Sequence, residues 1–231
     1  IIYSRSSCRN FKTDPLTDLE IEQIQAILDK VSLRTGPFGN KIRLFLIAHQ
    51  KLSKEEAGEL KASATIRGAK SFIVGIVKKN KMDYEDFGYL FEHVVLDCTE
   101  LRLATVWMGS TFNRPAFEKY LKMQEDEAIP AITPIGHSKD SQGLIGGIFR
   151  KSINADNRKP WSGIFFKDNF STPIKAEACP EKYKKALEWV NVGPSARNKQ
   201  PWRLLIKDNE VHFYLEAESM ENNLPVIRGF Q

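Results

Sequence analysis

The sequence has no run of 18 apolar residues, so it offers no segment that could cross a membrane as a helix. Residues 1–5 do not form a signal peptide. They also lack an initiator Met, and we therefore expect a trimmed chain. These absences predict a protein that has no membrane partner.

Cysteine is scarce as well. The 231 residues include only Cys8, Cys98 and Cys179, which lie far apart and form no C-x-x-C pair. This spacing predicts neither a disulfide framework nor a zinc site, and it is typical of a reducing cytosol. The four histidines share no spacing, and no Ser/His/Asp or Cys/His arrangement is visible. We therefore expect a cytoplasmic protein with no metal site and no catalytic side chain of its own.

Charge of one sign is not concentrated anywhere. The net charge is +5, but the 34 Lys and Arg residues are spread along the chain and mixed with 29 Asp and Glu residues. This pattern favours a solvated mixed surface that also attracts anionic cofactors, and it disfavours a nucleic-acid partner. A basic nucleic-acid binder remains an alternative. Such a protein would retain DNA or RNA in a salt-sensitive way and would be colourless, because it would hold no coloured cofactor.

What is present is typical of a globular chain with a large core. Hydrophobic residues make up 42% and charged residues 27%, and the length suits one large domain or two small ones. In the first part of the chain, Thr17 and Glu20 spell a capping box that starts a helix with an apolar face up to Val31. We further expect buried strands at 42–48 and 72–77, a helix over 53–69 and a long central core helix over 84–104.

The second part of the chain is less regular. The pattern predicts a strand over 129–135, placed at a sheet edge because Pro130 and Pro134 interrupt it. We also expect helices over 114–123, 144–153 and 180–192, and a hairpin formed by strands 203–207 and 211–215. Together these elements predict an α+β fold, with a mixed β-sheet flanked by helices and a long core helix at its centre.

A weak internal repeat suggests two halves. A helix, Gly-Pro, Asn and then Arg-Leu occur over 21–46 and again over 182–206. Chance similarity of two helix–loop–strand units explains the repeat equally well. We place the boundary within 154–160, which divides the chain into 1–155 and a shorter second half, 156–231. The second half has no counterpart of the long core helix and is therefore incomplete.

Arg5, Ser7 and Arg9 suit a phosphate group. Guanidinium forks bind phosphate oxygens in pairs, and a serine hydroxyl adds a donor. In an extended segment these alternating residues share one face, which Phe11 continues toward the core. The alternative is a frayed cationic N-terminus with no ligand.

Residues 194–202, which read PSARNKQPW, form a polar loop between a predicted helix and a predicted strand. Pro194 and Pro201 restrict φ, whereas Ser195 and Asn198 can hydrogen-bond backbone or ligand. The spelling resembles the PSxxNxQPW loop of the flavin-dependent nitroreductases, and the R-x-S-x-R-x-F segment at 5–11 resembles the phosphate segment of the same family. Three further stretches share the resemblance: 106–114, 129–136 and 157–161.

The full pattern is similar to the subfamily in which one chain holds two nitroreductase-like halves, a fused version of the usual homodimer. The first half has TGPFGN at 35–40 where a second PSxxN loop would lie, and the second half has no R-x-S-x-R. The resemblance therefore implies a single flavin, FMN, and a monomeric pseudo-dimer or a weak homo-oligomer. The residues that it implies for cofactor binding are Arg5, Ser6, Ser7, Arg9, Met108, Gly109, Ser110, Arg158, Pro194, Ser195, Ala196 and Asn198.

Individual roles follow from the same resemblance. The backbone amides of Gly109 and Ser110 would approach flavin N5 and stabilise the charge that develops there, and Arg158 would add to the phosphate grip. Gln200 is a weaker candidate that braces the loop. Taken without the resemblance, residues 107–110 are a plain turn and Arg158 is a solvated linker charge.

The resemblance implies an FMN-dependent oxidoreductase that receives hydride from NADH or NADPH. The hydride would pass through flavin N5 to a small-molecule acceptor such as a nitroaromatic or a quinone, with ping-pong kinetics. The alternative of another class is a non-catalytic FMN-binding protein for storage or sensing, which needs the same binding residues.

Overall fold

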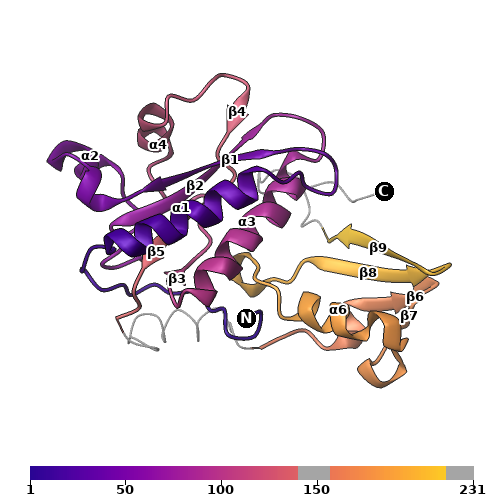
Figure 1. Cartoon of the computed structure of the whole chain (residues 1–231). Helices are drawn as coiled ribbons and strands as arrows, with labels where there is room; N and C mark the ends of the chain where they lie inside the picture. The colour runs from indigo at the N-terminus through magenta and orange to yellow at the C-terminus, as the bar shows by residue number, and fades with distance from the viewer. Residues whose placement is uncertain (140–156, 217–231) are drawn as a thin grey trace. The chain divides into compact units, whose positions relative to one another are not determined.

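The computed structural model describes residues 1–139 and 157–216. The chain folds into two compact units, Ile1–Gly147 and Ile148–Gln231 (Figure 1). The boundary expected at 155/156 and the helix expected over 144–153 lie outside the described residues. Within the described ranges, no helix is long and apolar enough to span a membrane.

The first unit is built on a five-stranded sheet with the order β1-β2-β5-β3, in which β4 also pairs with β2. All pairings between these strands are antiparallel, and Ile73 in β2 lies opposite Leu46 of β1 and Thr133 of β5. The central strand β2 is buried along seven of its eight residues. The strands are β1 (Ile42–Ile47), β2 (Ser71–Lys78), β3 (Ala104–Thr105), β4 (Glu127–Ala128) and β5 (Ile132–Gly136).

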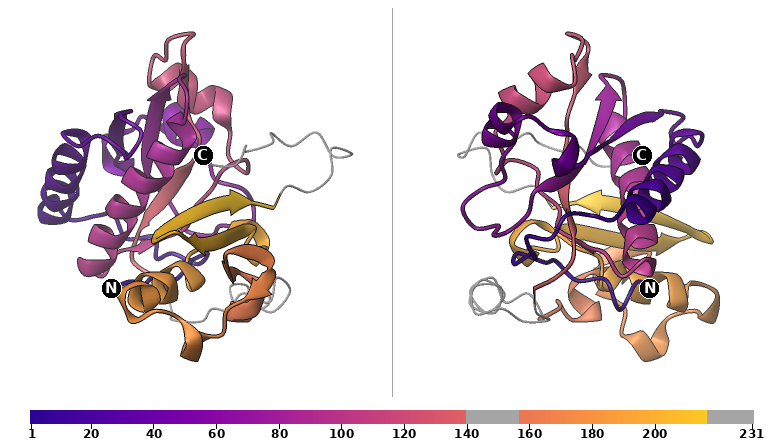
Figure 2. Two further views of the ribbon diagram at one scale, coloured as in Figure 1. Left: turned by 90° about the vertical axis from the view of Figure 1, so that its right-hand side faces the viewer. Right: turned by 60° about the vertical axis from the view of Figure 1, so that its left-hand side comes forward.

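Two helices, α1 (Asp18–Ser32) and α3 (Asp83–Glu100), pack side by side on one face of this sheet (Figures 1 and 2). The capping box predicted at Thr17 is present, because the Thr17 hydroxyl accepts from the Glu20 amide and the Glu20 carboxylate accepts from the Thr17 amide. Helix α3 buries most of its circumference, as a core helix does. Burial raises the pKa of the Cys98 thiol in this helix to about 12.

A second apolar cluster covers the opposite face of the sheet. It joins Phe72 and Val74 of β2 to Phe117 of helix α4 (Arg114–Tyr120) and to Phe11 of the N-terminal segment. Phe11 is 2% exposed, which confirms its predicted role as a core anchor. Among residues 1–139, the remaining helical segments are α2 (Lys54–Glu59) and the 3-10 turn η1 (His49–Lys51).

Two helix ends differ from the prediction by four residues or more. The helix expected over 53–69 ends at Glu59, because the chain that follows pairs with other segments: Ala62 with Phe112 and Arg67 with Asn10. These tertiary pairings override the helix propensity of a Lys/Glu/Ala-rich stretch. The core helix ends at Glu100 and not at Ala104, because the chain then turns at Arg102 (φ 59°) into β3.

The placement of β5 at a sheet edge is wrong, since β5 lies between β2 and β3. Pro134 is tolerated inside the sheet because β3 is only two residues long and pairs with Ile135 and Gly136. Beyond that point the Val106 amide donates to the Thr133 hydroxyl at 3.0 Å in place of a backbone partner. The Val106 amide thus has a side-chain acceptor where the pairing of β5 with β3 stops.

The second unit contains a four-stranded sheet with the order β7-β6-β8-β9. Strands β6 and β8 are parallel and the other neighbours antiparallel, so this sheet is mixed. The sheet that packs against the long core helix is entirely antiparallel and not mixed as expected. Helix α6 (Glu181–Asn191) packs on it through Leu187, against a cluster that contains Phe165 and Leu204. The strands are β6 (Phe165–Lys167), β7 (Asn169–Pro173), β8 (Trp202–Lys207) and β9 (Glu210–Leu215), and the 3-10 turns are η2 (Trp161–Gly163), η3 (Ala176–Ala178) and η4 (Ala196–Asn198).

The predicted hairpin is confirmed. Asp208 and Asn209 join β8 to β9, and both have positive φ, at 49° and 66°. Two consecutive residues of this conformation make the tight turn that suits the twist of paired strands, and Asp and Asn tolerate it better than other non-glycine residues.

Candidate functional site

The N-terminal segment lies along β3 of the first unit. Ser7 forms a parallel bridge with Thr105, and the Cys8 amide donates to the Thr105 carbonyl at 2.9 Å. Arg67 then exchanges two backbone hydrogen bonds with the segment, accepting from Phe11 and donating to Arg9. The segment that carries Arg5, Ser6, Ser7 and Arg9 is therefore held by the fold and is not a frayed end.

Gly68 permits this close approach. Its φ is +74°, and a Cβ at this position would overlap the carbonyl oxygen of Phe11. Replacing Gly68 by alanine is expected to destabilise the protein by about 3 kcal/mol, because backbone strain and a backbone clash add together. Urea denaturation measures this loss. The control is Gly58→Ala in α2, where a Cβ meets nothing within 4 Å. Equal stability of the two variants would show that the close approach is unimportant.

Arg5 and Trp107 both contact Glu92 of α3. The Trp107 indole Nε1 donates to Glu92 Oε2 at 2.7 Å, and Arg5 Nε lies 3.8 Å from Oε1. The Arg5 side chain is only 9% exposed. Burial raises the pKa of the Glu92 carboxyl, whereas the Trp107 bond and the charge of Arg5 oppose that rise. Glu92 thus ties the predicted phosphate segment to the residue that precedes Met108.

Residues 108–110 divide into a buried and an exposed part. Met108 is 3% exposed, and its amide and carbonyl both pair with Ile132. Gly109 and Ser110 are exposed, and their amides donate to no acceptor within the part of the chain that the structure describes. A Cβ at Gly109 would meet only the Pro130 carbonyl oxygen, at 3.8 Å. Two exposed amide donors and an unfilled space beside Gly109 fit a ligand that approaches the backbone here.

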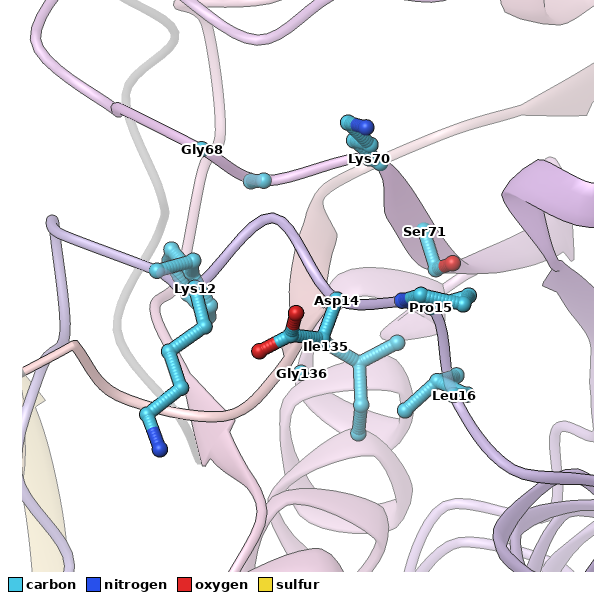
Figure 3. Close-up of a pocket in the computed structure, with 11 residues that line it drawn as sticks. Lys12, Asp14, Pro15, Leu16, Gly68, Lys70, Ser71, Ile135 and Gly136 are labelled. Carbon is cyan, nitrogen blue, oxygen red and sulfur yellow. The ribbon is translucent and has the colours of Figure 1, made fainter.

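A small cavity lies at the far end of the N-terminal segment, lined by Lys12, Asp14, Gly68 and Ser71 among others (Figure 3). Its volume is about 10 Å³, which is room for about one water molecule and far less than a flavin needs. This cavity is therefore not the cofactor site.

In the second unit, the loop at 194–202 has a strained backbone. Arg197, Asn198 and Gln200 have positive φ, at 52°, 55° and 47°. Such conformations of non-glycine residues persist only where surrounding contacts hold them. The loop must therefore be fastened by specific hydrogen bonds.

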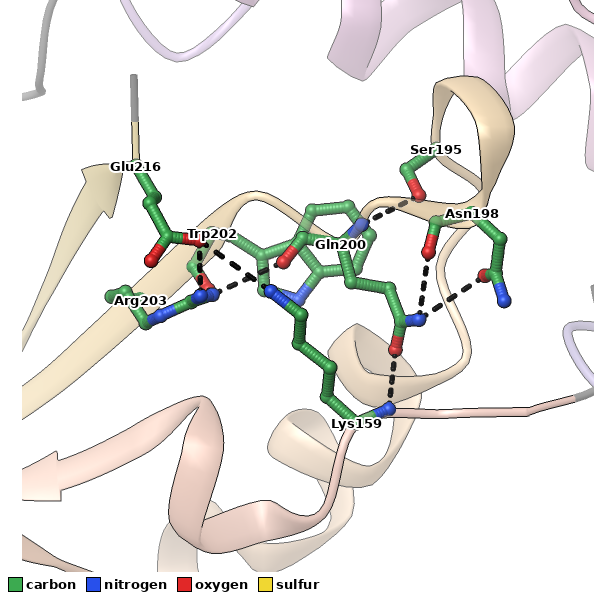
Figure 4. Close-up of polar contacts among 7 residues, drawn as sticks. All are labelled: Lys159, Ser195, Asn198, Gln200, Trp202, Arg203 and Glu216. Atoms are coloured by element: carbon green, nitrogen blue, oxygen red, sulfur yellow. Dashed lines mark hydrogen bonds and ion pairs between the residues drawn. The ribbon is translucent and has the colours of Figure 1, made fainter. Parts of the chain in front are cut away.

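Gln200 supplies several of these bonds and is 2% exposed (Figure 4). Its backbone amide donates to Ser195 Oγ at 2.9 Å. In its side chain, Oε1 accepts from the Lys159 backbone amide at 2.8 Å, and Nε2 donates to the Asn198 backbone carbonyl at 2.9 Å. The bracing role suggested for Gln200 by the sequence agrees with these contacts. The side chains of Lys159 and Arg203 both reach Glu216 at the exposed end of β9.

Arg158 lies against the same loop. Its Nη1 donates to the Gly193 carbonyl at 2.9 Å and to Asn198 Oδ1 at 3.0 Å, and its Nη2 donates to the Val192 carbonyl at 3.0 Å. The Asn198 side-chain nitrogen Nδ2 in turn donates to the Asn157 backbone carbonyl at 2.8 Å. The structure therefore brings Arg158 and Asn198 together, next to Ser195 and Pro194.

Among residues 1–139 and 157–216, no three His, Cys, Asp or Glu side chains gather as metal ligands would. The residues that sequence reasoning missed are Glu92, which joins two predicted site segments, and Gly68, which lets one of them pack. Neither belongs to a recognisable motif, so only the contacts reveal them.

The fold agrees with that of solved nitroreductase-family structures. A putative nitroreductase from Thermotoga maritima superposes with a TM-score of 0.57 at 19% identity, covering 93% of this chain and 74% of the other. A nitroreductase family protein from Clostridium difficile 630 gives 0.52 at 19% identity, covering 70% of this chain and 93% of the other. No curated protein matches the chain.

The family is decided by the sequence match. Residues 1–226 match the family model described as "Putative TM nitroreductase". The chain therefore belongs to this nitroreductase family, and the family resemblance and α+β fold expected from the sequence are confirmed.

Proposed function

We propose that this protein is an FMN-dependent oxidoreductase that takes hydride from NADH or NADPH and passes it to a small-molecule acceptor such as a nitroaromatic or a quinone. The observation that carries the proposal is the family match over residues 1–226, because it includes both the N-terminal phosphate segment and the PSARNKQPW loop. The backbone amides of Gly109 and Ser110 also support the proposal, because they are exposed and donate to no acceptor among the described residues.

Each set of residues has a chemical task. Arg5, Ser7 and Arg9, with the neighbouring Ser6, offer two guanidinium groups and hydroxyl donors for a phosphate. The backbone amides of Gly109 and Ser110 are assigned to the flavin ring, where hydrogen-bond donors stabilise the negative charge that develops on the ring. Pro194, Ser195, Ala196 and Asn198 form the loop assigned to the same cofactor.

The cofactor, when bound, supplies the electron-transfer chemistry, and the protein binds and orients it. No described side chain needs to act as an acid or a base in this proposal. The Ser195 hydroxyl accepts the Gln200 amide, which leaves its own hydrogen for a further acceptor. The protein's contribution is thus a set of fixed donors.

Stopped-flow mixing of the flavin-loaded protein with NADH or NADPH tests the proposal. We expect the absorbance of the oxidised flavin, at about 450 nm, to bleach. The rate of bleaching should lie in the range of enzyme turnover numbers, about 1–1000 per second. A protein that is yellow but does not bleach would be a storage or sensing protein. A colourless protein that takes up no FMN would contradict both readings.

A further inference from the structure

We propose that Arg158 is a positioning residue that locks the loop at 194–202, and that it does not serve as a ligand of the cofactor phosphate. The consequence for flavin binding rests on the function proposed above. The contacts that support it lie entirely within the second unit, between Arg158, the C-terminal end of α6 and Asn198.

The first part of the lock is at the end of α6. The helix ends at Asn191, and the carbonyls of its last turn have no partner inside the helix. Just beyond it, Arg158 donates to the carbonyls of Val192 and Gly193, where a cation is also favoured by the helix dipole. The two terminal nitrogens of the guanidinium reach neighbouring carbonyls, a geometry that the compact ammonium of lysine cannot reproduce.

The second part of the lock is at Asn198. Its Oδ1 accepts from Arg158 Nη1 at 3.0 Å and from Gln200 Nε2 at 3.2 Å, while its Nδ2 donates to the Asn157 carbonyl. Asn198 has a φ of 55°. The bonds to Arg158 and Gln200 offset the conformational cost of that backbone. Arg158 therefore connects the end of α6 to the strained part of the loop.

Three of the five N–H groups of the Arg158 guanidinium make these contacts, both of those on Nη1 and one on Nη2. A phosphate bound by Nη1 and Nη2 together would therefore release the Gly193 carbonyl or the Asn198 side chain from Nη1, and the phosphate is assigned to Arg5 and Arg9 instead. Arg158 acts on the flavin through the loop, so it affects flavins with and without a phosphate alike.

The test compares FMN with riboflavin, which lacks the phosphate. In Arg158→Ala and Arg158→Lys we expect the affinities for FMN and riboflavin, measured by flavin fluorescence titration, to fall by the same factor of about tenfold, the effect of one lost charged hydrogen bond. In the flavin-free variants, amide hydrogen exchange at 195–200 should accelerate by about tenfold. The control is Lys167→Ala, which removes one exposed charge from β6 of the same unit and should change neither quantity.

A loss of FMN affinity with unchanged riboflavin affinity, or full retention of FMN binding in Arg158→Lys, would identify Arg158 as a phosphate ligand and overturn the proposal. Unchanged exchange at 195–200 in Arg158→Ala would overturn it as well. If the wild-type protein binds neither flavin, the proposed function fails, but the exchange measurement still decides whether Arg158 locks the loop.

Discussion

Replacing both Arg5 and Arg9 by alanine is expected to weaken FMN binding by about 100-fold and to leave riboflavin binding within about threefold of wild type. The reason is that two charge-assisted hydrogen bonds to a phosphate contribute roughly 3 kcal/mol together. Titration of the flavin-free protein with both flavins measures the two affinities. The ratio of the two matters more than either value, because general damage to the fold weakens both flavins.

The structure makes this comparison necessary. The Arg5 side chain is nearly buried beside Glu92, so its removal also disturbs the contact through which Glu92 holds Trp107. The matched control is the double variant Arg34→Ala/Lys41→Ala, which removes the same charge from exposed positions of the first unit. If the double Arg5/Arg9 variant binds FMN as tightly as this control does, the assignment of the phosphate to the N-terminal segment is wrong.

Replacing Asp86 by alanine is expected to cost about 3–5 kcal/mol of folding free energy, because hydrogen bonds to a buried charged group contribute roughly 1.5–3 kcal/mol each. Asp86 is fully buried in the first turn of α3. Its carboxylate oxygens accept from the backbone amides of Phe38 and Asn40, at 2.8 and 2.7 Å. The variant leaves both amides without this acceptor and removes an acidic group from a helix N-terminus.

Chemical denaturation followed by circular dichroism measures the loss, and Asp97→Ala is the control on the same helix. Asp97 forms a surface ion pair with Lys30, so its removal should cost no more than about 1 kcal/mol. Gly36→Ala probes the same contact from the other side, because a Cβ there would overlap the Asp86 carboxyl group. Stability equal to that of Asp97→Ala would show that Asp86 does not anchor the loop at 36–40.

Local patterns predicted the elements that local physics controls. The capping box at Thr17 and Glu20, the apolar face of α1 and the Asp208-Asn209 turn need only residues a few positions apart, so their consequences can be computed along the chain. The core helix was predicted for the same reason, although its end was placed four residues late. Its last turn is decided by the chain turning into β3, which no local pattern announces.

The errors share a different cause. The stretch at 60–69 has the composition of a helix, but its backbone pairs with Phe112 and with Asn10, and such pairing depends on which segments the fold brings together. Pro134 is predicted at a sheet edge, yet β5 lies between β2 and β3, and the Thr133 hydroxyl accepts from the Val106 amide where the pairing with β3 stops. Both outcomes depend on partners distant in sequence, which propensity does not describe.

By itself, the sequence determined the family and the two candidate segments, because short motifs such as R-x-S-x-R and PSARNKQPW can be recognised without a structure. Only the tertiary structure decided what holds those segments. Glu92 meets Arg5 and Trp107, and Arg158 meets Asn198, across long stretches of chain. A hydrogen bond requires two groups within about 3 Å in space, and spacing along the chain gives no measure of that distance once the chain has folded.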